Sequence, residues 1–233
     1  MERTQPFERI GHRGAPREAR ENTLPSVERA IERGADAVEI DVHATADAIL
    51  VVHHDPTFAE GVSPASLRGR AIAELSWAAV RSAELAPGVG IPRLDELLDR
   101  VAGRAIVYVE VKGAGIEQLV ADAVARNTAT CAVHSFDHAA IERLRAIAPT
   151  IPRGILFESE PSALEDVIER TGARDVWPHW QLIDRPLVER VHAANGRVIA
   201  WTVNSSEVAA ELARLGVDGI CSDDLRFLSP GGS

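Results

Sequence analysis

Lysine, cysteine, aromatic residues and long apolar runs are all scarce in this 233-residue chain. No apolar run approaches the roughly 18 residues that a membrane-spanning helix needs, which predicts a protein without a membrane span. The first ten residues, MERTQPFERI, lack the apolar stretch of a secretory signal peptide, so we expect a cytoplasmic protein. The two cysteines, Cys131 and Cys221, have no metal-ligand spacing and are expected to be free thiols.

Positive charge is also in deficit, with 25 lysine and arginine residues against 35 aspartate and glutamate residues and a formal net charge of −10. Nucleic-acid-binding proteins typically present a basic face, so we expect no nucleic-acid partner. An anionic substrate is not excluded, because a local cluster of cations or a metal overrides the mean charge. Lys112 is the only lysine among the 25 basic residues, and the others are arginines. A single lysine among arginines is expected where a site requires a compact ammonium group.

The balance of 45% apolar and 26% charged residues is typical of a folded domain and excludes a disordered or fibrous chain. Short β-branched runs alternate with longer helical patterns. The predicted strands are Glu8–Gly11, Ala37–Val42, Ala105–Val111, Thr130–Ser135, Arg153–Phe157, Asp175–Trp177, Arg197–Val203 and Gly219–Ser222. Eight strands joined by helices predict an α/β fold, a TIM (β/α)₈ barrel, which typically needs about 250 residues. A doubly wound open sheet is the alternative, less favoured because no G-x-G-x-x-G stands in the first turn.

Helical patterns fill most of the connections. They cover Leu24–Arg33, Leu94–Val101, Ile116–Arg126, His138–Ile147, Pro161–Thr171, Arg185–Ala194 and Ser206–Leu215. An extra short strand, Ile49–His53, follows the second strand, and a long connection with one helix-like piece, Ile72–Ser82, follows it. Because such long connections are usually functional, we expect residues 1–233 to form one domain with 55–92 as a small insertion over the barrel mouth, where barrel active sites lie.

Acidic residues alternate with aliphatic ones on two predicted strands. Glu39 and Asp41 share one face of the second strand, and Glu110 and Lys112 repeat the pattern on the third. Carboxylates that point into a barrel are costly unless a cation compensates them. The alternatives are salt bridges, with arginine or between Glu110 and Lys112, or a divalent metal site. Oxygen ligands favour Mg²⁺, Ca²⁺ or Mn²⁺ over Zn²⁺.

Histidines occur at two strand ends that face the predicted mouth. His12 and Arg13 end the first strand, and His53, His54 and Asp55 end the extra strand. Histidine suits proton transfer because its ordinary pKa is about 6.5, whereas a satisfied structural histidine is the common alternative. Arg13 offers a fork that fits phosphate oxygens, or it is simply solvated at the surface.

These residues together resemble the glycerophosphodiester phosphodiesterase family. The motifs that carry the resemblance are His12-Arg13-Gly14, Glu21-Asn22-Thr23, Glu39-x-Asp41, His54-Asp55 and Glu110-x-Lys112, followed by the C-terminal segment Val198–Asp223. Each triplet is weak alone, but five in the family's order are specific, and the resemblance covers nearly the whole chain. Glu21 and Asn22 either belong to the site or close the loop and cap the next helix.

The resemblance implies roles for eight residues. Glu39, Asp41 and Glu110 hold one divalent cation, commonly Ca²⁺ or Mg²⁺. His12 and His54 are the general base and general acid, in an order that could be reversed. Arg13 and Lys112 bind the phosphoryl oxygens of the substrate. Trp201 either forms a wall of the substrate pocket or packs at the barrel rim. The remaining histidines near strand ends, His43, His134 and His179, are expected to be structural or to lie behind the site.

The implied activity is metal-dependent hydrolysis of glycerophosphodiesters, such as glycerophosphocholine or glycerophosphoethanolamine, to an alcohol and sn-glycerol 3-phosphate. The expected partner is therefore a small molecule. One alternative is lysophospholipase D-like action on lysolipids, which would need an apolar lip; the candidates are Phe58, Trp77, Trp177 and Trp180. Another is a non-catalytic metabolite-binding barrel.

Overall fold

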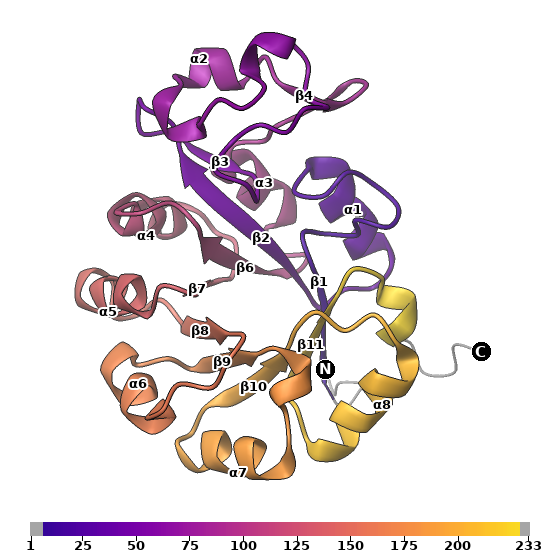
Figure 1. Ribbon diagram of the computed structural model, residues 1–233, viewed down its shortest axis with the longest axis vertical. Helices are drawn as coiled ribbons and strands as arrows, with labels where there is room; N and C mark the ends of the chain where they lie inside the picture. Colours follow the sequence, from indigo (N-terminus) through magenta and orange to yellow (C-terminus); the bar gives the residue numbers. More distant parts are fainter. Residues whose placement is uncertain (1–6, 229–233) are drawn as a thin grey trace.

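The computed structural model describes residues 7–228. In it, eight parallel strands run in the order β1-β11-β10-β9-β8-β7-β6-β2, and β1 also pairs with β2, which closes the ring (Figure 1). The strands are β1 (Glu8–Gly11), β2 (Ala37–Ala44), β6 (Ile106–Val111), β7 (Cys131–Ser135), β8 (Arg153–Phe157), β9 (Asp175–Pro178), β10 (Arg197–Ala200) and β11 (Gly219–Ser222). The predicted TIM barrel is confirmed.

Helices surround the barrel (Figure 1). They are α1 (Leu24–Glu32), α3 (Leu94–Val101), α4 (Glu117–Arg126), α5 (His138–Ile147), α6 (Leu164–Thr171), α7 (Arg185–Ala193), α8 (Ser206–Leu215) and the 3₁₀ helix η4 (Leu225–Leu228). Side-chain caps start several of them: Thr23 accepts from the Ser26 amide and Asp184 from the Leu187 amide. No helix among residues 7–228 is long and apolar enough to cross a membrane.

Two predicted elements are wrong by three residues at one end, and several others differ by one or two residues. Helix α6 begins at Leu164 rather than at Pro161, because a turn at Ser162 and Ala163 separates Pro161 from the helix. Strand β10 ends at Ala200 rather than at Val203, and Trp201 then makes an isolated bridge to His179. The strand therefore ends, and the loop at the barrel mouth begins, earlier than the apolar pattern of the sequence indicates.

Alternation along the strands divides the apolar residues into two cores. On β2, the buried aliphatic residues Val38, Ile40 and Val42 pack outward against the helices. Ile10, Tyr108, Trp177 and Ile199 form a separate buried cluster inside the barrel, to which Cys221 belongs. Both cysteines are buried and free. A filled barrel interior leaves the ends of the barrel as the places for polar side chains.

The amino ends of the strands are closed by buried ion pairs. Nη2 of Arg197 lies 2.6 Å from Oε2 of Glu8, and its Nη1 lies 3.1 Å from Oδ1 of Asp175. The same Nη1 donates to the hydroxyl of Tyr108 at 3.2 Å. Two carboxylates that would be costly alone are thus neutralised at the floor of the barrel.

The connection after β2 has a small core of its own. Strand β3 (Leu50–Val52) runs antiparallel to β2. The helical pieces η1 (Ala65–Leu67), η2 (Ile72–Glu74) and α2 (Trp77–Val80) follow, and then the hairpin strands β4 (Glu84–Ala86) and β5 (Val89–Gly90). The expected helical piece Ile72–Ser82 is broken into η2 and α2. Phe58, Ile72 and Val80 are buried together in this part, whose α2 and β4 lie at the top of Figure 1. That the insertion covers the barrel mouth stays a prediction.

His53 is buried at the start of this insertion, with its ring 5.7 Å from that of Phe58. Burial lowers the pKa of His53 to about 4. Between pH 6.5 and about 4 the unfolded chain therefore binds a proton that the folded chain does not, so stability is lost as the pH falls through this range.

We predict that His53→Phe makes the protein less sensitive to acid. From the linkage relation, His53 should cost the wild type about 2 kcal/mol of unfolding free energy between pH 7 and pH 5. The variant should lose that much less, as measured by urea unfolding at the two pH values. His192→Phe, at an exposed histidine, is the control, and an unchanged pH dependence in His53→Phe would contradict the prediction.

Candidate active site

A pocket of about 290 Å³ opens at the carboxyl ends of the barrel strands, the end at which barrel active sites form. Its walls contain most of the predicted site residues, and no residue of 55–92 is among those described as lining it. The lining residues are His12, Arg13, Glu39, His54, Glu110, Lys112, His134, Phe136, Leu156, Glu158, Trp177, Trp201 and Cys221.

Two buried carboxylates, Glu39 and Glu110, line this pocket, and a third, Asp41, lies beside them. Glu39, Asp41 and Glu110 are at most 5% exposed, and Asp41 lies opposite Glu110 in the register of β2 and β6. Nζ of Lys112 lies 2.7 Å from Oε1 of Glu110 and 3.4 Å from Oδ1 of Asp41. Nε of Arg13 lies 3.2 Å from Oδ2 of Asp41. The single lysine of the chain therefore stands among the buried acids.

The charges of this group do not balance. Burial raises the pKa of Asp41, but the charges of Lys112 and Arg13 outweigh it and hold that pKa below its usual value. Burial, together with the charge of Asp41, raises the pKa of Glu110 despite the neighbouring ammonium of Lys112. Three carboxylates face two cations, so the base of the pocket favours a further positive charge.

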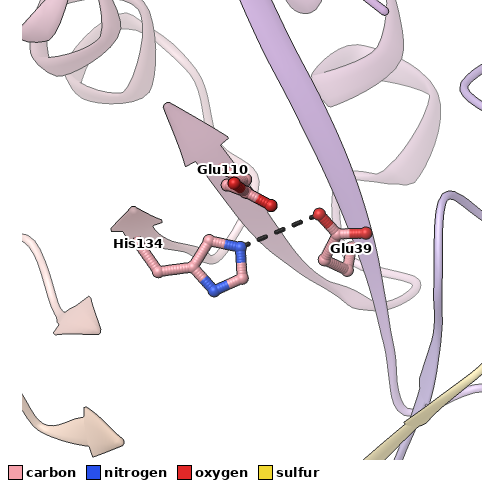
Figure 2. Close-up of side chains that lie close together, drawn as sticks. All are labelled: Glu39, Glu110 and His134. Atoms are coloured by element: carbon pink, nitrogen blue, oxygen red, sulfur yellow. Dashed lines mark ion pairs between the residues drawn. The ribbon is translucent and has the colours of Figure 1, made fainter. Parts of the chain in front are cut away.

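The atoms best placed to share a cation belong to Glu39, Glu110 and His134. One ligand atom of each lies within 4.8 Å of the others, and all three side chains are buried. Figure 2 shows the three side chains pointing toward one another from neighbouring strands. Oε1 of Glu39 and both ring nitrogens of His134 lack a hydrogen-bond partner within residues 7–228. A divalent cation fits these donors.

Asp41, the third predicted ligand, is not in that group. Its Oδ2 accepts a hydrogen bond from Nδ2 of Asn22 at 2.8 Å and faces Arg13, while its Oδ1 faces Lys112. The side chain nevertheless stays beside Glu110. The metal role of Glu39, Asp41 and Glu110 stays a prediction.

His12 is held at the mouth by a tight turn and a carboxylate. A Cβ atom at Gly11 would lie 2.4 Å from the Gly14 carbonyl oxygen, so only glycine fits there. Nδ1 of His12 lies 2.6 Å from Oδ1 of Asp223, whose other oxygen accepts from Asn204 at 2.7 Å. Burial lowers the pKa of His12, but the hydrogen bond to Asp223 and the charge of Glu39 outweigh it and leave the pKa raised.

His54 reaches the same pocket from the loop after β3. Its Nδ1 lies 2.7 Å from Oδ1 of Asp55, and its side chain is 33% exposed. Its backbone carbonyl lies 3.0 Å from Nε2 of His43, which fixes the loop to β2. His53 instead turns into the insertion core beside Phe58. Of the two adjacent histidines, only His54 lines the pocket.

Aromatic rings form one wall. Nε1 of Trp201 donates to the carbonyl of Trp177 at 2.8 Å, and its ring packs edge-on against Phe136 with centroids 5.3 Å apart. Nζ of Lys112 lies 5.5 Å from the centroid of Phe136, a cation–π distance. Trp201 thus lines the pocket and Phe136 adds a second ring, while the contact of Trp201 with substrate stays a prediction.

Sequence reasoning missed three polar residues of the site. Asn22 was left open between site and loop, and its amide proves to hold Asp41. Asp223 was noted only as part of a C-terminal motif. The sequence predicts that His134 is structural or lies behind the site, whereas its position on β7, in register with Glu110, places it on the inward face. The alternation of side chains along a strand, which puts every second residue on the inward face, is the sequence signal that could have identified His134.

Comparison with known proteins agrees with this site. Residues 12–226 match the sequence pattern of the glycerophosphoryl diester phosphodiesterase family. A glycerophosphodiester phosphodiesterase from Caldanaerobacter subterraneus subsp. tengcongensis is 28% identical over 226 residues, covering 92% of this chain and 93% of the relative.

Solved structures show the same likeness. A phosphodiesterase from Oleispira antarctica in complex with the product sn-glycerol-3-phosphate superposes with a TM-score of 0.85 at 26% identity, covering 93% of this chain and 92% of the other. A structure described as a putative glycerophosphoryl diester phosphodiesterase from Silicibacter pomeroyi gives a TM-score of 0.85 at 26% identity, covering 95% and 91%. On its barrel, its carboxylate-based pocket and these matches, the chain belongs to the glycerophosphoryl diester phosphodiesterase family of enzymes.

Proposed function

We propose that this chain hydrolyses glycerophosphodiesters, such as glycerophosphocholine or glycerophosphoethanolamine, to an alcohol and sn-glycerol 3-phosphate. The observation that carries the proposal is the convergence of two histidines, two cations and the buried carboxylates Glu39 and Glu110 in one pocket, with Asp41 paired to both cations beside it. The Oleispira relative, whose structure contains sn-glycerol-3-phosphate, supports the choice of product. Residues 1–233 would act as one domain, with 55–92 as its insertion.

The carboxylates would hold one divalent cation, for which Ca²⁺ and Mg²⁺ are the first candidates and Mn²⁺ a third. Glu39 and Glu110 would be ligands, with Asp41 beside them. When bound, the cation supplies Lewis acidity to the phosphoryl group. Arg13 and Lys112 would bind the nonbridging oxygens, because a guanidinium and an ammonium in a shielded pocket neutralise the charge that develops there.

Two histidines would move the protons. In each, a carboxylate binds Nδ1 (Asp223 for His12 and Asp55 for His54), which leaves Nε2 available to the substrate. Nε2 of His12 lies 3.9 Å from Glu39, at the metal side of the pocket. His12 would therefore take the proton of the nucleophile, and His54 would protonate the departing alcohol.

The lysolipid alternative loses part of its support. It needed an apolar lip from Phe58, Trp77, Trp177 and Trp180, but Phe58 and Trp177 are 2% and 1% exposed. Phe58 belongs to the insertion core, and Trp177 to the barrel interior. Trp77 and Trp180 are partly exposed, so the proposed lip loses two of its four candidates, and the lysolipid alternative remains the second candidate.

We predict that His54→Ala lowers turnover about 10²- to 10⁴-fold, the usual contribution of a general acid. Release of glycerol 3-phosphate from glycerophosphocholine measures it. His192→Ala, at an exposed histidine on α7, should keep wild-type turnover, and both variants should match the wild type in thermal unfolding. Near-normal turnover in His54→Ala would remove this residue from the mechanism.

We predict that Glu39→Gln abolishes turnover and weakens divalent-cation binding in calorimetric titrations with Mg²⁺, Ca²⁺ and Mn²⁺, because a charged ligand is lost. Glu165→Gln, which removes an exposed carboxylate paired with Arg190 on the helical surface, should leave both unchanged. A Glu39→Gln enzyme that stays active and still requires metal would show that Glu39 is not a ligand.

The proposed function is tested most directly with wild-type protein. Glycerol 3-phosphate release from glycerophosphocholine and glycerophosphoethanolamine should require Mg²⁺, Ca²⁺ or Mn²⁺ and stop with EDTA. No release from either substrate with any of these three metals, or with Co²⁺, Ni²⁺ or Zn²⁺, would overturn the proposal, and activity on lysolipids instead would support the alternative.

A further inference from the structure

His134 is a buried imidazole without a hydrogen bond. It lies on β7 with 1% of its surface exposed, and neither ring nitrogen has a partner among residues 7–228. A neutral imidazole carries one donor and one acceptor, and burying both unpaired is costly. A position that keeps such a residue inside a barrel points to a ligand that the side chains alone do not supply.

The surroundings of His134 fix its ring without satisfying it. The ring of Trp177 packs edge-on at a centroid distance of 4.4 Å, and that of Tyr108 stacks at 6.1 Å. Gly154 is its register partner on β8, where a Cβ atom would come within 3.1 Å of the His134 Cβ. These neighbours pack closely around the imidazole, and its Nε2 faces Glu39.

That nitrogen faces a carboxylate oxygen that is also unpaired. Nε2 of His134 lies 3.8 Å from Oε1 of Glu39, and the dashed line in Figure 2 marks this pair. The separation is too long for a hydrogen bond. It suits two ligands of one ion, since metal–nitrogen and metal–oxygen bonds of about 2.0–2.2 Å place two ligand atoms up to about 4.2 Å apart.

We propose that His134 is a direct nitrogen ligand of the divalent cation, together with Glu39 and Glu110, and that it shifts the preference of the site toward Co²⁺, Ni²⁺ and Zn²⁺. This inference rests on the metal-dependent function proposed above, and it adds a residue and a metal class to that site.

The chemistry of the donors supports this preference. All-oxygen sites suit Mg²⁺ and Ca²⁺, whereas imidazole suits later transition metals. Charge balance points to the same set, because Glu39 and Glu110 neutralise a divalent ion once a neutral imidazole completes the group. Asp41 meanwhile keeps its partners Arg13 and Lys112.

Calorimetric titration of the metal-free protein with Co²⁺ and with Mg²⁺ tests the preference. The wild type should bind Co²⁺ more tightly than Mg²⁺. His134→Gln should weaken Co²⁺ binding about 10-fold or more, by analogy with the loss of residues that support metal ligands, and change Mg²⁺ binding by less than about threefold, because Mg²⁺ prefers oxygen. His192→Gln is the matched control and should change neither. Equal loss of both metals, or of neither, in His134→Gln overturns the preference.

Spin-echo spectroscopy of bound Mn²⁺ tests the bond itself. The wild type and His192→Gln should show modulation from a directly bound imidazole nitrogen, and His134→Gln and His134→Asn should not. Modulation that persists in both His134 variants would assign the nitrogen to another histidine and overturn the inference, as would its absence from the wild type. If both variants fail to fold, the wild-type spectrum still tests the inference, because absence of nitrogen modulation there overturns it.

The two proposals fail separately. Hydrolysis of glycerophosphocholine without nitrogen modulation from bound metal would retain the proposed function and reject His134 as a ligand. Nitrogen modulation that depends on His134, in a protein that hydrolyses no glycerophosphodiester, would retain the ligand and reject the proposed function.

Discussion

Burial of three carboxylates inside the mouth of the barrel is the constraint on which the site depends. Glu39, Asp41 and Glu110 reach this position because alternation on β2 and β6 turns their aliphatic neighbours outward to the helices. Acids so buried require cations, which accounts for the placing of Lys112 and Arg13. The remaining negative charge makes the pocket receptive to a metal.

Buried carboxylates are neutralised in different ways at the two ends of the barrel. At the floor, Arg197 pairs with both Glu8 and Asp175, and Nε of Arg174 donates to Asp175 at 3.0 Å. At the mouth, Glu39 and His134 keep unpaired polar atoms. A satisfied ion cluster contributes structure, whereas an unsatisfied one contributes binding capacity, so the chemistry lies at one end only.

Much of the fold and of the site could be predicted from the sequence, because the alternation of residues along strands and the capping residues of helices are local signals. The eight strands, the inward face of Glu39 and Asp41, and most helix starts follow from short-range pattern. The role of Asp223 could not, since its contact with His12 joins residues 211 positions apart. The insertion was also hard to predict, because 3₁₀ turns and a short hairpin carry no sustained periodicity. His134 was missed for another reason: its parity was visible, but its lack of partners is a property of three-dimensional packing.

Closure of the barrel by β1 has a consequence for how the protein is made. Glu8 pairs in register with Gly219, so the first strand is complete on one side only when the last strand is in place. During synthesis the ribosome releases β1 long before β11, and until then β1 and β10 both present open edges. Open strand edges are templates for aggregation, and contacts between distant residues slow folding. The nascent chain therefore remains exposed to misassociation until β11 emerges and pairs with β1 and β10.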